Sequence, residues 1–255
     1  MDRRIITIAR YTLLEAWRTR LPWLALAILV LVCAASLFIK AIAITETLRL
    51  QIAFIAAVLR VAMAFVAGLY VIATTVRELN DKGMELALSL DLPRATWMLG
   101  KLAGFGLVAA GLAWAAAIPL LVLAPWPQAL AWGVSLMLEL WIVIALALFC
   151  ITTFNQLMPA ASFVLAFYLL ARSITAIRLI AASPLSDVGG GIGHHIMNGA
   201  VKTVAFIVPA FDHYTQTAWL VNGTHPALTG IMIQSAIYVA LLVAATLFDF
   251  YRKNF

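Results

Sequence analysis

The sequence predicts an all-α integral membrane protein with six transmembrane helices. Of the 255 residues, 65% are hydrophobic and 11% are charged, whereas a soluble domain carries roughly 25% charged residues. Six apolar runs approach or exceed the length of about 20 residues that a helix needs to cross the hydrocarbon core. The basic residues between these runs are concentrated on one side of the predicted membrane. These three observations together favour lipid as the solvent of the fold.

The six predicted spans follow one another along a chain that forms a single domain over residues 1–255. Their apolar runs are continuous and lack the alternation of a barrel strand, so helices are the expected spanning form. Pro125-Trp126-Pro127 divides the third and fourth spans and predicts a tight helical hairpin. The predicted spans are residues 21–42, 52–76, 102–124, 128–152, 160–182 and 229–250.

The basic residues predict the orientation of the chain. With six spans both termini share one side, and eleven basic residues of the connecting segments then lie inside against three outside. This distribution follows the positive-inside rule, so the net charge of +6 indicates membrane orientation and no nucleic-acid partner. We expect the bacterial inner membrane, with both termini cytoplasmic. The inner set is Arg3, Arg4, Arg10, Arg18, Arg20, Arg77, Lys82, Arg94, Lys101, Arg252 and Lys253, and the outer set is Lys40, Arg49 and Lys202.

Residues 1–20 predict an amphipathic helix ahead of the first span. Charged and apolar side chains are mixed around this helix in a way that suits the membrane interface, with Trp17 at headgroup depth and the arginines toward anionic lipid. The residues that define this interfacial helix are Glu15, Trp17, Arg18 and Arg20.

Residues 77–101 form the one sizeable inner loop, which is charged and amphipathic. Leucines at helical spacing predict a short helix that Pro93 ends. Such a helix is either a docking element for a partner or a solvated connector, and the residues alone favour neither interpretation.

Residues 183–228 form the one long outer loop. Gly189-Gly190-Gly191 is followed there by an apolar stretch that Pro209 breaks, and we expect one or two short helices lying on the outer surface. The loop holds all four histidines, whose spacing matches no defined metal motif, so no metal site is predicted. These histidines are His194, His195, His213 and His225.

Four ionisable residues interrupt the predicted spans: Arg60, Glu139, Arg172 and Arg178. A charge at the bilayer centre costs roughly 2.5–3.5 kcal/mol on insertion scales, so Glu139 and Arg172 are expected to face the bundle interior. An ion pair between them is the favoured interpretation, and contact with a substrate or with a second subunit are the alternatives. Arg60 lies nearer the outer leaflet, and we expect it to extend toward the lipid headgroups.

Three places along the chain resemble the permease subunits of the type-2 ATP-binding-cassette (ABC) exporter family. The opening has Ala9-Arg10, Leu14-Glu15 and Arg18-Thr19-Arg20 before the first span. The inner loop has Arg77-Glu78, Gly83, Glu85 and a leucine-rich turn, then Arg94 and Gly100-Lys101. The outer loop has Val208-Pro209-Ala210-Phe211 and Val221-Asn222-Gly223. With the six-span plan, this resemblance covers essentially the whole chain.

The resemblance implies a coupling helix at residues 77–94 that sits in a groove of a separate ATPase subunit, and an elbow helix at residues 1–20 that contacts the same subunit. ATP and Mg²⁺ are expected on that partner, because this chain has no Gly-x-x-x-x-Gly-Lys-Ser/Thr motif. We expect no catalytic residue or cofactor in this chain. The residues that the resemblance implies for ATPase coupling are Arg77, Glu78, Lys82, Gly83, Glu85, Leu86, Leu90 and Arg94.

The resemblance also implies pairing with a second permease subunit, identical or related, and outward movement of a substrate that the sequence does not identify. An alternative is a subunit that transports nothing and transmits force through its outer loop to a periplasmic partner, for example in metalloenzyme maturation. An ion-driven secondary transporter would need paired midplane carboxylates, and Glu139 alone fits that description.

Overall fold

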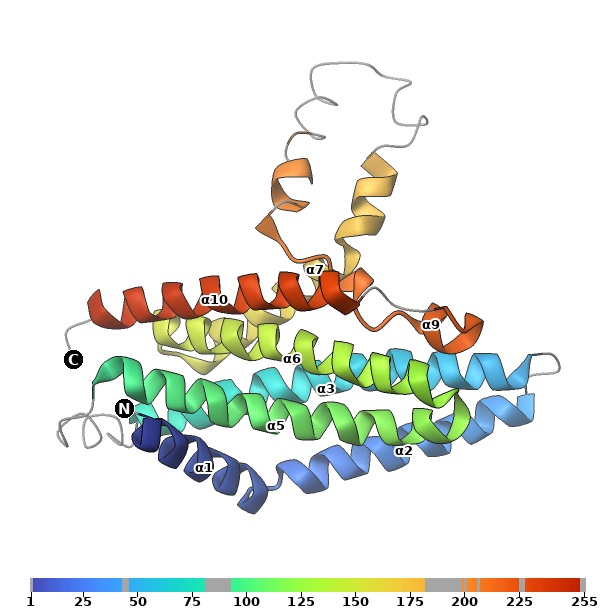
Figure 1. Ribbon diagram of the computed structural model, residues 1–255, viewed down its shortest axis with the longest axis horizontal. Helices are drawn as coiled ribbons and strands as arrows, with labels where there is room; N and C mark the ends of the chain where they lie inside the picture. The colour runs from blue at the N-terminus through green and yellow to red at the C-terminus, as the bar shows by residue number, and fades with distance from the viewer. Residues whose placement is uncertain are drawn as a thin grey trace.

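The computed structural model describes residues 2–42, 46–80, 93–181, 199, 201–205, 207–224 and 228–252. Within these ranges, long helices pack side by side into an elongated bundle (Figure 1). Six of them are long and apolar enough to cross a membrane, which confirms the predicted number of candidate spans. They are α2 (Leu21–Ile42), α3 (Thr47–Asn80), α5 (Arg94–Leu123), α6 (Trp126–Phe154), α7 (Leu157–Ala181) and α10 (Leu228–Arg252).

Five of these helices, all except α2, are longer than the spans predicted from hydropathy, and α3 exceeds its prediction the most. α3 has 34 residues, which is about 51 Å at 1.5 Å per residue, against about 30 Å of hydrocarbon. Its backbone hydrogen bonds continue past the apolar run, so Arg77 and Glu78 belong to α3, and Arg94 begins α5. The bounds predicted for a separate helix over residues 77–94 are therefore wrong, because both of its ends belong to the flanking helices. Its middle, residues 81–92, lies outside the described residues.

The hairpin between the third and fourth spans is confirmed. α5 continues through Pro119 to Leu123, and α6 begins at Trp126. Pro125 is the N-cap of α6 and has a φ of −57°, and a second proline, Pro127, lies in the first turn of α6. Pro93, the N-cap of α5, has a similar φ of −58°. A proline ring fixes φ near this value and lacks the N–H that the first turn of a helix leaves unpaired, so the three-residue motif suits a helix start.

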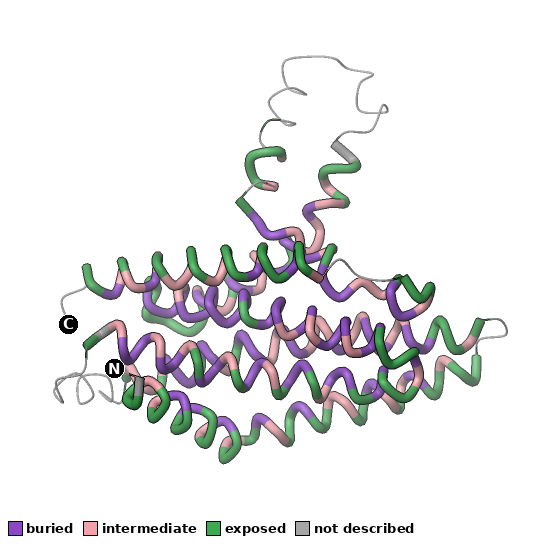
Figure 2. The backbone as a smooth tube through the Cα atoms, in the orientation of Figure 1, coloured by how far each residue is buried: buried purple, intermediate pink, exposed green. Residues whose placement is uncertain are grey.

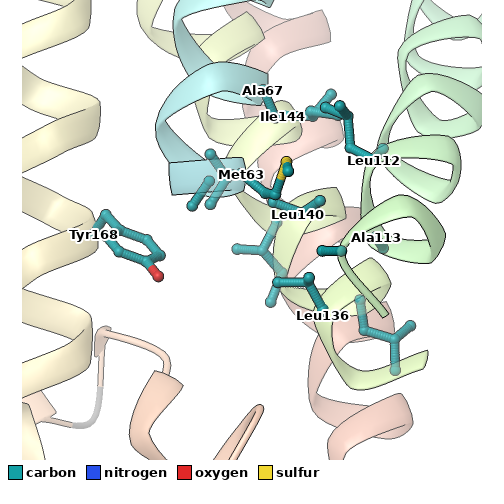
Figure 3. Close-up of a cluster of buried hydrophobic side chains, with 14 of the residues drawn as sticks. Met63, Ala67, Leu112, Ala113, Leu136, Leu140, Ile144 and Tyr168 are labelled. Atoms are coloured by element: carbon teal, nitrogen blue, oxygen red, sulfur yellow. The ribbon is translucent and has the colours of Figure 1, made fainter. Parts of the chain in front are cut away.

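α6 is the centre of the bundle. It packs against α3, α5, α7 and α10, and in its most apolar window 78% of the residues are buried. Buried positions are concentrated along the middle of the bundle, whereas exposed positions lie on the outer helices (Figure 2). Figure 3 shows part of this core, with labelled side chains from α3, α5, α6 and α7. These are Met63, Ala67, Leu112, Ala113, Leu136, Leu140, Ile144 and Tyr168.

The outer helices expose large apolar side chains. In the most apolar windows of α2 and α10 only 17% of the residues are buried. Trp23, Leu31 and Phe248 are 74%, 69% and 70% exposed, respectively. A helix at the surface of a water-soluble bundle presents a polar face instead, and apolar patches of this extent mark contact with a partner or a membrane. The surface is therefore suited to lipid, as the composition predicts.

A helix is also found at the N-terminus, where α1 (Asp2–Arg18) packs along α5. Two glycines of α5 allow this close approach. A Cβ atom at Gly104 would lie 2.6 Å from Cβ of Thr12, and one at Gly100 would lie 2.7 Å from Cβ of Ile8. Small residues four apart let two helix backbones approach closely, as in membrane helix pairs. The α1–α5 contact thus depends on Gly100 and Gly104.

Replacement of Gly104 by alanine tests this contact. We expect Gly104→Ala to lower the free energy of unfolding by about 1–3 kcal/mol, because the added methyl group overpacks the contact with Thr12. Gly111→Ala is the matched control: it lies on the same helix with no atom within 4 Å of the added Cβ, so the gain in helix propensity, up to about 1 kcal/mol, is unopposed. Thermal unfolding in detergent measures both. Equal effects of the two substitutions would contradict the close contact.

Candidate functional site

Both termini lie at one end of the bundle, which we call the termini end (Figure 1). The described parts of α3 and α5 that flank residues 81–92 also meet there, so several sequence-predicted site residues gather at this end. The α2–α3 and α5–α6 connections lie at the opposite end, which we call the far end (Figure 1). One cluster of charged side chains lies at the termini end, and a second lies near the middle of the bundle, around Glu139 of α6.

At the termini end, Lys101 of α5 joins three helices. Its ammonium forms an ion pair with Glu78 of α3 and lies 3.9 Å from a carboxylate oxygen of Glu15 of α1. The Lys101 side chain is 10% exposed, and the Glu78 and Glu15 side chains are 25% and 35% exposed. Because a largely buried ammonium needs opposite charge beside it, these three residues hold the ends of α1, α3 and α5 together.

Aromatic rings complete the surroundings of Lys101. Its ammonium lies 5.7 Å from the centroid of the Phe105 ring, within the range of a cation–π interaction. Tyr70 of α3 contacts Phe105 edge-on, with 6.0 Å between the ring centroids. The sequence placed Glu15 and Glu78 in two separate motifs and did not predict that Lys101 joins them. The adjoining Gly100, which brings α1 close to α5, is the signal that could have found this cluster.

The structure describes some, and not all, of the other sequence-predicted residues of this end. Trp17, Arg18, Arg20 and Arg77 are exposed, with Trp17 at 76%, so each is accessible to lipid or to a partner. Arg94 begins α5. The remaining residues proposed for ATPase coupling lie outside the described residues: Lys82, Gly83, Glu85, Leu86 and Leu90.

The second cluster surrounds Glu139 of α6, which is fully buried. A guanidinium nitrogen of Arg172 lies 3.7 Å from its carboxylate, so the expected ion pair between α6 and α7 is present. The Tyr168 hydroxyl donates a hydrogen bond of 2.9 Å to one carboxylate oxygen. The Thr215 hydroxyl donates one of 2.9 Å to the other. The carboxylate is therefore matched by two hydrogen-bond donors and one guanidinium, as a buried charge requires.

Residues 208–222, which we call the capping segment, supply backbone partners to this cluster. Arg172 donates to the carbonyl oxygens of Phe211 and Tyr214, and Arg60 of α3 donates to that of Thr215 at 3.0 Å. The expectation that Arg60 extends toward the headgroups is therefore wrong. A backbone carbonyl group that lies outside a helix inside a bundle needs a hydrogen-bond donor, and Arg60 supplies one to Thr215.

The capping segment enters the bundle, whereas the sequence predicted short helices on the outer surface. It contains the short helices η2 (Phe211–His213) and α9 (Thr217–Asn222). Phe211, Tyr214 and Thr215 are 0% exposed, because the rings of Phe211 and Tyr214 pack edge-to-face at 5.6 Å within the core. The surface position is therefore wrong for this segment. By contrast, the last turns of α7 and residues 201–205 project from the side of the bundle (Figure 1).

Two further contacts fix the capping segment. The backbone N–H of Thr215 donates to the Ser135 hydroxyl of α6 at 3.1 Å, and Thr215 has a positive φ of 46°, a conformation that costs a non-glycine residue energy. The Tyr214 hydroxyl lies 2.9 Å from that of Ser235 of α10. Burial raises the pKa of Tyr214 to about 12, so this hydroxyl keeps its proton at neutral pH and the contact is a hydrogen bond between neutral groups.

The histidines gather no metal ligands in the part of the chain that the structure describes. His213 is exposed and its imidazole lies 4.0 Å from Asp212, whereas His194, His195 and His225 lie outside the described ranges.

The described part of the chain forms an all-helical bundle with six candidate membrane spans, and charged contacts tie its helices together at the termini end and near the middle of the bundle. A comparison of the chain with protein-family models finds no match, and a comparison with curated proteins likewise finds no similar sequence.

Removal of the Tyr168 hydroxyl tests the buried cluster. We expect Tyr168→Phe to lower the free energy of unfolding by about 1.5–3 kcal/mol, because it removes a hydrogen bond to a carboxylate with no access to solvent. Tyr238→Phe, which removes a half-buried hydroxyl on α10 outside the cluster, is the control and should change stability by less than about 0.5 kcal/mol. Urea or thermal unfolding in detergent compares the two. A negligible effect of Tyr168→Phe would rule out a charged, donor-dependent Glu139.

Proposed function

We propose that this chain is the permease subunit of an ATP-driven ABC exporter, and that a separate ATPase subunit docks at the termini end. The order of sequence motifs around six apolar helices supports this proposal, as does their resemblance to type-2 ABC permeases. The outward direction of transport follows from the resemblance.

The Lys101 cluster is the observation that carries the proposal. A partner at the termini end would contact exposed residues of α1 and the residues that follow α3. Lys101 joins α1, α3 and α5 near the end of α3 and the start of α5, the two helices that residues 81–92 connect in the sequence. Movement imposed on any one of the three is therefore shared by the others, because separating the charges leaves a buried ammonium without its carboxylates.

α3 connects the two clusters. Glu78 and Arg60 lie 18 residues apart on this one helix, which is about 27 Å at 1.5 Å per residue. A tilt of α3 at the termini end therefore displaces Arg60 relative to Thr215 in the capping segment. ATP binding would favour one arrangement only through contacts that differ between the two arrangements, and the residues at 77–94 together with α1 are the proposed contacts.

The alternative function, force transmission to an external partner, is supported by the capping segment. Hydrogen bonds from Arg60, Arg172 and Tyr214 tie this segment to α3, α7 and α10, so rearrangement of these helices would move it. ATPase stimulation of the reconstituted complex separates the two functions. A small or lipidic substrate stimulates a transporter, and a protein partner stimulates a force-transmitting subunit.

Affinity purification from native membranes tests the proposal. The full-length chain, solubilised in mild detergent, is expected to retain an ATPase subunit with nucleotide-binding motifs. Glu85→Arg combined with Leu86→Asp should reduce its recovery at least about tenfold, a loss of 1.4 kcal/mol of binding free energy. The control applies the same changes to two exposed residues at the far end, Glu46→Arg and Leu48→Asp, and should retain the ATPase. Absence of any ATPase from the wild-type preparation would contradict the proposal.

A further inference from the structure

An apolar groove runs between α1 and α5 on the outer side of the bundle. It has a volume of about 710 Å³, within the range of roughly 300–1,000 Å³ that is common for small-molecule sites. Its lining includes Ile6 and Leu13 of α1, Leu102 and Leu107 of α5, and Trp141 of α6. A second apolar groove of about 340 Å³, between α1, α2 and α5, shares Leu13 and Leu107 with the first.

The groove opens outward and its wall is held in place. Ile6, Leu107 and Trp141 are 65%, 52% and 38% exposed, so they line a surface that the bundle itself does not cover. The indole N–H of Trp141 donates to the carbonyl oxygen of Gly106 at 3.1 Å. This bond fixes the ring and uses its polar atom, so Trp141 presents an apolar face to the groove.

Arg10 is the one charged residue among the described residues that line the groove. It is exposed, and no carboxylate of the described chain forms an ion pair with it. Glu15, the acidic residue one and a half turns further along α1, lies beside Lys101 instead. The groove therefore combines an apolar lining with a single unmatched positive charge.

From this combination we propose that the groove binds a phospholipid with an anionic headgroup, whose phosphate pairs with Arg10 and whose acyl chain lies along α5. The apolar walls accept a chain of any phospholipid, because burial of CH₂ groups does not depend on the headgroup. Selectivity comes from Arg10, since a guanidinium binds a phosphate oxygen strongly. A zwitterionic phospholipid carries its own cation beside the phosphate and gains less from Arg10. This site does not depend on the proposed exporter function.

The length of the first groove fits an acyl chain. Its α5 residues extend from Leu99 to Ala110, 11 residues or about 17 Å along the helix, which is close to half of the hydrocarbon thickness of a bilayer, the part that one leaflet fills. Leu13 of α1 lines both grooves. A lipid at this place contacts both helices, so its binding should stabilise the packing of α1 on α5.

Quenching of Trp141 by brominated lipid tests the site. The full chain is reconstituted in vesicles of equal parts phosphatidylglycerol and phosphatidylcholine, with bromine on the acyl chains of one lipid or of the other. Subtraction of the emission of Trp141→Phe isolates the signal of Trp141. We expect a preference of about five-fold for phosphatidylglycerol, because one basic residue near anionic lipid contributes about 1 kcal/mol. Equal quenching by the two lipids would overturn the proposal.

Two arginine substitutions assign the preference to the groove. Arg10→Gln should reduce the preference to near unity, whereas Arg3→Gln, an equal change of charge at an exposed position of α1 outside the groove, should leave it in place. The same loss in both variants would show a diffuse effect of charge and overturn the assignment to Arg10. Mass spectrometry of the lipid retained after purification gives an independent readout that does not need Trp141. Wild type and Arg3→Gln should be enriched in phosphatidylglycerol, and Arg10→Gln should not.

Discussion

Glu139 is a carboxylate with no exposed surface in the central helix of an apolar bundle, and the arrangement of the helices around it depends on the hydrogen bonds and the ion pair that it requires. Tyr168 and Arg172 come from α7, and Thr215 comes from the capping segment. Loss of one partner from a buried ion pair costs about 3–5 kcal/mol. The pairing therefore fixes how α6 and α7 face each other and where the capping segment enters. Arg60 adds α3 to the same arrangement.

At the termini end, a buried charge of the opposite sign likewise determines which helices contact one another. There a largely buried ammonium, Lys101, gathers carboxylates from α1 and α3. The glycines of α5 bring α1 close enough to take part. Helices that expose apolar side chains to lipid gain little from packing against one another on hydrophobic grounds, since lipid is equally apolar. Close packing at small residues and buried ionic contacts are thus the interactions that give this bundle a defined arrangement, and α3 carries one contact of each cluster.

The number of spans could be predicted from sequence because hydrocarbon thickness imposes a local, countable constraint on each apolar run. The Pro125-Trp126-Pro127 hairpin was predictable for the same local reason. Contacts between distant residues were less accessible. The Glu139–Arg172 pair could be inferred because opposite charges in neighbouring spans need partners. Arg60 and Thr215, by contrast, are 155 residues apart, and hydropathy does not indicate which face of a helix points toward which neighbour. The capping segment was misplaced because apolar residues in a loop suit an outer surface facing lipid as well as a bundle interior.

The proposed docking of an ATPase subunit at the termini end is tested most directly by photocrosslinking in intact native membranes. A photoreactive amino acid at Asn80, the exposed last residue of α3, should capture an ATPase subunit. The same group at Glu46, exposed at the far end, should not. Capture of the ATPase from Asn80 alone is the predicted result. Capture from Glu46 alone, or of no ATPase from either position, would contradict the account.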